Sequence, residues 1–216
     1  MKPRSSNQTN HALTLVELLI IIVILAILAA IILPTLHGPH SSINKVKTIV
    51  CINNLKEIGL AYRVWGGDHG DKYPMGISVT NGGAMELVVT GNILVNFLVM
   101  SNELSTPKIL HCPEDMEHFG TNSFAGLTSS NISYFVNVDA TEAYPQMLLS
   151  GDDNFEIRGV PIKSGLLELS TNTPISWTAA RHKFVGNLSI ADGSVQQVTQ
   201  SGLSSALVIT NRIAIP

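Results

Sequence analysis

An unbroken apolar stretch near the N-terminus most constrains what this chain can fold into. Residues 13–33 read LTLVELLIIIVILAILAAIIL, and only Thr14 and Glu17 among them are polar. As a helix rising about 1.5 Å per residue, the segment would be about 31 Å long, which matches the hydrocarbon core of a bilayer. A run that is apolar on every face does not fit the surface of an ordinary globular domain. We therefore expect a membrane-embedded helix that Pro34 ends.

The polar segment before this stretch indicates how the helix is oriented. Residues 1–12 read MKPRSSNQTNHA and carry one lysine and one arginine but no acid. Cations on this side predict a cytoplasmic N-terminus. A secretory signal peptide explains the segment less well, because apolar residues continue past the candidate cleavage site at Ala29 and Ala30. A plain membrane anchor is the simplest alternative, and it leaves only Glu17 unexplained.

Glu17 is the only ionisable residue in the apolar stretch. A carboxylate inside a bilayer is costly, so an ionisable residue there indicates a function and requires a partner. The stretch contains no lysine or arginine that could neutralise it. Proteolysis just before Leu13 would create a free amino group about one helical turn away. We therefore expect Glu17 to pair with the new N-terminus of a neighbouring subunit shifted along the helix axis.

The residues around this glutamate resemble the cleavage and methylation motif of type IV prepilins and pseudopilins. Residues 12–19 read ALTLVELL, and a cut after Ala12 would make Leu13 the first residue and Glu17 the fifth, as in that family. Pro34 would be the twenty-second, where the family commonly carries a helix-kinking proline. Two residues depart from the pattern: alanine replaces the usual glycine before the cut, and leucine replaces the usual phenylalanine after it.

The resemblance implies a structural filament subunit rather than an enzyme. Prepilin peptidase would remove residues 1–12 and methylate the Leu13 amine, and residues 13–37 would form the transmembrane and assembly helix. The expected partners are further copies of the chain, other pseudopilins, the inner-membrane assembly platform and membrane lipid. The protein would cross the inner membrane once, with its C-terminal domain outside the cytoplasm. Nucleic acid is not expected, because a net charge of -3 offers no basic surface, and this favours a type II secretion pseudopilus over a DNA-uptake fibre.

A second helix and a β-rich domain are predicted beyond the membrane segment. Apolar residues recur every three or four positions across residues 42–65, which predicts an amphipathic helix ended by Gly66 and Gly67. We assign residues 38–66 to a continuation of the N-terminal helical region and residues 67–216 to the globular domain. The predicted fold class is α+β and pilin-like: a long apolar N-terminal helix followed by a small antiparallel β-sheet domain.

Short apolar runs separated by Gly, Pro, Asn and Asp indicate the strands of this domain. Three runs are interpreted as strands: 132–138, 156–162 and 174–179. Residues 85–100 fit either a short helix or a pair of strands. Asp192-Gly193 between two extended runs is the clearest turn, since both residues tolerate the positive φ angles of a hairpin.

A second family element lies near the C-terminus. His182 is followed after nine residues by Asp192-Gly193, which resembles an H-x9-D-G pattern found near the C-terminus of one large pilin-like family. The segments around Cys51 and Cys112 also resemble the two cysteine-bearing segments of that family. The resemblance assigns no chemical role to the H-x9-D-G element.

The two cysteines, Cys51 and Cys112, do not form a C-x-x-C pair, so neither a zinc knuckle nor a thioredoxin-like site is predicted. Outside the cytoplasm they would form a disulfide that closes a loop of about 60 residues and contributes roughly 4 kcal/mol. Two buried free thiols are the alternative. Cys51, His182 and Asp192 also have the residue types of a thiol nucleophile, its base and an orienting acid. A mid-helix cysteine and a turn aspartate favour the structural interpretation.

Asp152 and Asp153 are candidates for a calcium site. Their carboxylates are ligands of the kind that Ca²⁺ accepts, and some major pseudopilins hold calcium in a C-terminal loop. The spacing does not match an EF-hand, and solvated turn residues are the simpler interpretation. No other cofactor is predicted.

Two alternatives to the filament subunit stay open. One is a single-pass, extracytoplasmic binding module that never polymerises, and the other is a secreted enzyme with an unusual signal segment. The mature N-terminus separates the three: Leu13 for a filament subunit, an uncut Met1 for the anchored module, and a residue beyond Ala29 for the secreted enzyme.

Overall fold

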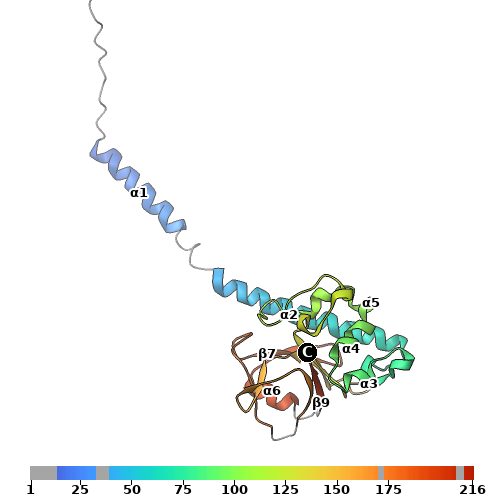
Figure 1. Ribbon diagram of the computed structural model, residues 1–216. Helices are drawn as coiled ribbons and strands as arrows, with labels where there is room; N and C mark the ends of the chain where they lie inside the picture. The colour runs from blue at the N-terminus through green and yellow to red at the C-terminus, as the bar shows by residue number, and fades with distance from the viewer. Residues whose placement is uncertain (1–13, 33–38, 170–172, 208–211) are drawn as a thin grey trace, which may run out of the picture. The chain divides into compact units, whose positions relative to one another are not determined.

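A computed structural model describes residues 14–32, 39–169, 173–207 and 212–216 (Figure 1). The chain forms two compact units, Met1–Ile43 and Asn44–Pro216. In the first unit, helix α1 (Leu15–Ile32) contains most of the apolar stretch, and its described large apolar side chains are exposed. Within the described ranges, no helix combines the length and the apolar character needed to cross a membrane. Pro34 lies outside them.

Helix α2 (Pro39–Asp68) is longer than the predicted helix at both ends. Proline fits its first turn, where the backbone N–H has no helical partner. The expected stop at Gly66 and Gly67 was wrong, because the helix continues through both glycines. Gly70, with a φ of 68°, provides the left-handed residue that follows the last turn, and the Asp71 N–H donates to the Gly66 carbonyl.

The second half of α2 belongs to the globular unit. One face of the helix is buried in the main core through Ala61 and five larger side chains: Cys51, Leu55, Ile58, Tyr62 and Trp65. Their spacing of three or four residues confirms the amphipathic pattern. The globular unit therefore begins within α2, at Asn44, whereas the sequence had assigned its start to residue 67.

Short helices connect α2 to the first strand. Three are α-helical: α3 (Met85–Val88), α4 (Ile93–Val99) and α5 (Ser101–Leu104). Residues 85–100 are therefore helical rather than a strand pair. Five are single 3₁₀ turns: η2 (Pro74–Gly76), η3 (Val79–Asn81), η4 (Pro107–Leu110), η5 (Phe124–Gly126) and η6 (Ser129–Asn131). The apolar side chains of Ile93, Phe97 and Met100 complete the core beside α2.

The β part consists of two antiparallel sheets, which confirms the α+β class. The larger has the order β5-β9-β1-β2-β7-β8 and the smaller the order β4-β3-β6. The strands of the larger sheet are β1 (Tyr134–Asn137), β2 (Leu148–Asp152), β5 (Gly165–Glu168), β7 (Gly186–Ile190), β8 (Val195–Val198) and β9 (Arg212–Ile215). Those of the smaller are β3 (Phe155–Ile157), β4 (Val160–Pro161) and β6 (Ile175–Trp177).

One predicted hairpin is confirmed, and one predicted strand is a hairpin instead. Strands β7 and β8 form the predicted hairpin at Asp192-Gly193, where Gly193 has a φ of 89°. Residues 156–162 were predicted as one strand but form a second hairpin, β3–β4. Arg158 and Gly159 both have positive φ angles, so the chain reverses direction there.

The larger sheet separates two apolar layers. Tyr134 and Val136 of β1 contact the core shared with α2, whereas Phe135 between them belongs to a second cluster with Phe155 and Trp177. This alternation follows from the two faces of a strand. Helix α6 (Gln200–Leu207) contributes Leu203 to the second cluster.

Candidate functional site

Glu17 has a local partner at the start of α1. Its Oε2 atom accepts hydrogen bonds from the Thr14 backbone N–H at 2.8 Å and from the Thr14 hydroxyl at 2.7 Å. The Glu17 N–H lies 3.3 Å from the Thr14 Oγ1 atom. This reciprocal pattern is a capping box, which satisfies free amide groups at a helix N-terminus. Only cationic partners were predicted for Glu17, although Thr-x-x-Glu is the recognised sequence pattern of a capping box.

Pairing of Glu17 with the amine of a neighbour stays a prediction. Ala12, Leu13 and Pro34, which were singled out with it, lie outside the described residues. The structure therefore describes the capping role of Glu17, and the two roles are compatible in a chain that begins at Leu13.

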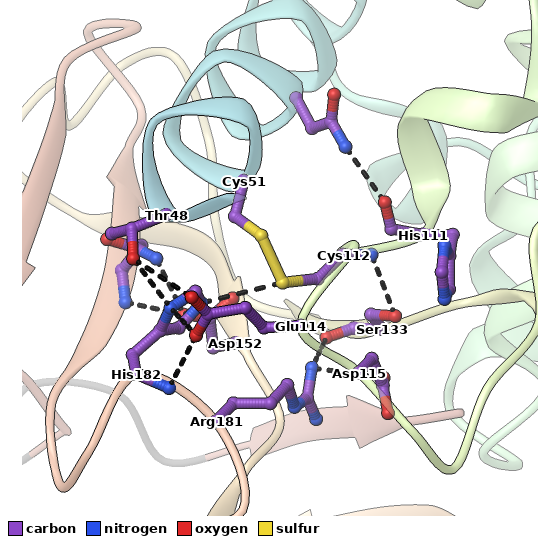
Figure 2. Close-up of a disulfide and its surroundings, with 12 residues drawn as sticks. Thr48, Cys51, His111, Cys112, Glu114, Asp115, Ser133, Asp152, Arg181 and His182 are labelled. Carbon is purple, nitrogen blue, oxygen red and sulfur yellow. Dashed lines mark hydrogen bonds and ion pairs between the residues drawn. A yellow bond between two sulfur atoms is a disulfide. The ribbon is translucent and has the colours of Figure 1, made fainter. Parts of the chain in front are cut away.

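The globular unit contains a buried disulfide (Figure 2). It joins Cys51 of α2 to Cys112, which follows η4, with the two Cα atoms 5.1 Å apart and both residues fully buried. The Cys112 N–H donates to the Ser133 hydroxyl at 3.0 Å, and the Asn54 amide donates to the His111 carbonyl at 2.9 Å. The disulfide is thus one of several links between α2 and the segment around Cys112.

His182, the histidine of the H-x9-D-G element, lies beside the disulfide (Figure 2). Its Nε2 atom is 3.5 Å from the Cys112 Sγ atom and 3.4 Å from the Asp152 Oδ2 atom. Its Nδ1 atom is 2.8 Å from the Glu114 Oε2 atom and 3.3 Å from the Thr48 hydroxyl. Two acidic residues thus contact opposite sides of one buried imidazole.

Asp152 is fully buried behind this imidazole. Its Oδ2 atom accepts hydrogen bonds from the Asn187 backbone N–H at 2.8 Å and from the Asn187 amide at 2.9 Å. Its Oδ1 atom has no hydrogen-bond partner among the described residues. Burial raises the pKa of Asp152, and the nearby His182 and Arg181 oppose this effect.

Arg181 connects two further carboxylates. Its guanidinium group forms ion pairs with Asp115, at 3.2 Å, and with Asp153, and it donates to the Ser133 carbonyl at 2.9 Å. Asp115 also lies 2.8 Å from the His118 ring. Burial alone would raise the pKa of Asp115, but the hydrogen bond from His118 and the charge of Arg181 lower it well below its usual range.

The predicted calcium candidates do not face a common site. The Asp152 carboxylate contacts His182 and Asn187, whereas the Asp153 carboxylate pairs with Arg181. An arginine already supplies the positive charge at Asp153. Among the described residues, two groups bring together side chains able to hold a metal: Cys51 with Cys112 and His182, and Asp115 with His118 and Asp153.

The structure does not assemble the candidate nucleophile, base and acid. Cys51 is bonded to Cys112, and the described carboxylates that contact His182 belong to Glu114 and Asp152 rather than to Asp192. Asp192 instead closes its turn by accepting a hydrogen bond from the Ser194 N–H at 2.8 Å. Its carbonyl accepts from Arg63 of α2 at 3.3 Å.

Residues 7–33 match the family model of the prokaryotic N-terminal methylation motif. This confirms the prepilin-type motif and supports a type IV pilin-like substrate of prepilin peptidase. The match includes Ala12, Leu13 and Glu17 but not the C-terminal H-x9-D-G element. No curated protein and no solved structure matches the chain.

Proposed function

We propose that this chain is a structural subunit of a type IV pilus-like or type II secretion pseudopilus filament. The observation that carries the proposal is the match of residues 7–33 to the N-terminal methylation motif. Prepilin peptidase would cut after Ala12 and methylate Leu13, and the apolar helices of many copies would form the filament core. Before assembly the chain would span the inner membrane once, with the globular unit outside the cytoplasm. A disulfide fits that oxidising location.

An exposed apolar stripe on α2 supports polymerisation. Four side chains on the face opposite the core are half exposed or more: Val46 at 59%, Ile49 at 56%, Leu60 at 54% and Val64 at 50%. At 3.6 residues per turn they fall within about a quarter of the helix circumference. The exposed polar residues Asn53, Lys56 and Glu57 divide them into two apolar pairs, and exposed apolar surface of this kind is typical of an interaction site. We propose that other copies of the chain cover it in the filament.

The mature N-terminus tests this proposal. Ala12 is small enough for a subsite that normally accepts glycine, so Ala12→Leu should leave the precursor uncut in the membrane, whereas Ala12→Gly should be processed as well as the wild type. Mass spectrometry should find wild-type protein beginning at a methylated Leu13. Wild-type chains that retain Met1, or normal processing of Ala12→Leu, would contradict the proposal.

A pocket beside Arg181 favours the alternative, a membrane-anchored binding module. It has a volume of about 440 Å³, and its walls include the polar side chains of Asp115, His118 and Thr178 and the ring of Phe155. Such a combination of polar and apolar walls is typical of a ligand site. An anchored module that never polymerises predicts monomers in the membrane, so cross-linking of cells should give single chains rather than ladders of subunits.

A further inference from the structure

Three side chains with soft or borderline metal-binding atoms meet in the core of the globular unit. The sulfur atoms of Cys51 and Cys112 and the Nε2 atom of His182 all lie within 4.8 Å of one another, and all three residues are buried. The Nε2 atom is 3.5 Å from the Cys112 sulfur. Zinc bonds of about 2.3 Å to sulfur and about 2.0 Å to nitrogen place two such ligands about 3.5 Å apart at a tetrahedral angle. The observed separation therefore suits a shared ion.

The imidazole of His182 is already oriented for such a role. Glu114 lies 2.8 Å from the Nδ1 atom, so its carboxylate favours a proton on Nδ1. In that tautomer the lone pair of Nε2 faces the sulfur atoms. A carboxylate that binds the outer nitrogen of a ligating histidine is the usual arrangement around zinc in proteins.

Asp152 provides an independent indication that a cation fits here. The residue has no exposed surface, and its Oδ1 atom lacks a hydrogen-bond donor among the described residues. A buried oxygen without a partner is unfavourable, and a bound cation would satisfy it. Its Oδ2 atom, which accepts both hydrogen bonds from Asn187, lies 3.4 Å from the His182 Nε2 atom, so the carboxylate borders this group of sulfur and nitrogen atoms.

We propose that the reduced protein binds one Zn²⁺ ion through Cys51, Cys112 and His182, with the Asp152 carboxylate beside these ligands. The disulfide and the zinc complex are then alternative states of one site. A dithiol reductant transfers two electrons and two protons to the disulfide, which becomes two thiols, and the reductant leaves as its cyclic disulfide. Zn²⁺ then displaces the two thiol protons into solvent and binds the thiolates. In the reverse direction, a disulfide oxidant would take two electrons from the thiolates and two protons from solvent and leave as two thiols, which re-forms the Cys51–Cys112 bond and releases the ion.

Titration with Co²⁺, a coloured substitute for Zn²⁺, tests the site. The full chain in detergent is reduced with dithiothreitol, freed of reductant under anaerobic conditions and titrated. We expect one equivalent to give thiolate charge-transfer absorption and intense tetrahedral visible bands, both removed by Zn²⁺. The disulfide form should give neither. His182→Ala should weaken binding at least tenfold, because a ligand is lost, and Asp152→Asn should weaken it about tenfold, in line with the losses seen when an outer-shell carboxylate is removed from a zinc site.

His118→Ala is the matched control, because it removes a histidine from the neighbouring group of Asp115 and Asp153 and should leave the Co²⁺ spectrum unchanged. Thermal unfolding provides a readout that does not depend on the variants: Zn²⁺ should raise the Tm of the reduced protein and not that of the disulfide form. The proposal is overturned by equal Co²⁺ binding to both forms, by a spectrum that His118→Ala abolishes and His182→Ala does not, or by a reduced chain that Zn²⁺ neither stabilises nor refolds.

Discussion

Glu114 accepts two hydrogen bonds from His182, since its Oε2 atom lies 3.0 Å from the backbone nitrogen and 2.8 Å from the Nδ1 atom. These contacts hold a backbone segment that is unfavourable by itself. His182, Lys183 and Phe184 have φ angles of 52°, 54° and 65°. The left-handed conformation costs about 1–2 kcal/mol for each residue other than glycine. The histidine of the H-x9-D-G element thus links this turn to the segment around Cys112.

Removal of the Glu114 carboxylate should release this turn. We expect Glu114→Ala to lower the free energy of unfolding by about 1–3 kcal/mol, because two buried donors lose their acceptor. Urea unfolding of the full chain in detergent measures the change. Glu117→Ala is the control, because Glu117 is exposed, and it should change stability by less than about 0.5 kcal/mol. Equal effects of the two substitutions would contradict a specific role for Glu114.

The ion pair between Asp115 and Arg181 should make stability depend on acid pH. The pKa of Asp115 is lower in the folded protein than in the unfolded chain. Its contribution is therefore fully present above the unfolded pKa, near pH 4, and is lost as the pH falls toward the lower, folded pKa. We expect Asp115→Asn to lower stability at pH 7 by about 1–3 kcal/mol, since the buried Arg181 loses one of its two charged partners and keeps Asp153.

Unfolding measured from pH 7 to pH 2 checks the sign of this effect. The curve of Asp115→Asn should be flatter than that of the wild type below pH 4, because one titrating group that favours the folded state is gone. Parallel curves would show that Asp115 does not carry the acid dependence.

Gly186 should not tolerate a side chain. An added Cβ atom would overlap the six-membered ring of Trp177, which is buried in the second apolar cluster. We expect Gly186→Ala to lower the free energy of unfolding by about 1–3 kcal/mol through overpacking. Gly67→Ala is the opposite case: its Cβ would meet no atom within 4 Å, and it lies inside α2. That substitution should be neutral or stabilise by up to about 1 kcal/mol.

The sequence correctly predicted those structural elements that are determined by residues close together in the chain. The spacing of buried residues along α2 and the turn at Asp192-Gly193 are visible within a few positions, and both are confirmed. The end of α2 was misplaced because the helix continues through Gly66 and Gly67 to Asp68, and Gly70, with a φ of 68°, is the left-handed glycine that follows its last turn. The sequence contains three glycines in this stretch and does not reveal which of them adopts the left-handed conformation.

For the buried cluster around His182, the sequence predicted the types of residue but not which residues are in contact. Cysteine and histidine were both singled out, but Asp192 was offered as the acid, because Asp-Gly drew attention to it. Asp152 contacts the imidazole instead, and Asn187 of β7 donates two hydrogen bonds to it because β2 pairs with β7. Pairing between segments so far apart in sequence leaves no local pattern.

The cysteine pair provides a separate prediction for native material. Protein purified without reductant should give one peptide linked through Cys51 and Cys112 in non-reducing mass mapping. Cys51→Ser with Cys112→Ser should lower stability by roughly 4 kcal/mol, because the unfolded chain loses a cross-link that closes a long loop. Two freely alkylated thiols in unreduced protein would contradict this prediction.

Two substitutions at Glu17 separate its capping role from its predicted role in assembly. Glu17→Gln keeps an oxygen that accepts hydrogen bonds from Thr14 and removes the charge, whereas Glu17→Val removes both. Both variants should enter the membrane at least as well as the wild type, since each removes a carboxylate from lipid. Cleavage before Leu13 should continue in both, because the cut site is unchanged.

If Glu17 neutralises the amine of a neighbouring subunit, both variants should fail to form filaments, and the valine variant should also start its first helix less well. If the carboxylate serves only the capping box with Thr14, glutamine should restore assembly to near the wild-type level, because it preserves the acceptor. The measurement is the yield of filaments, together with the amount of mature subunit in the membrane. Normal filaments from Glu17→Gln would rule out charge pairing, and normal filaments from Glu17→Val would rule out both roles in assembly.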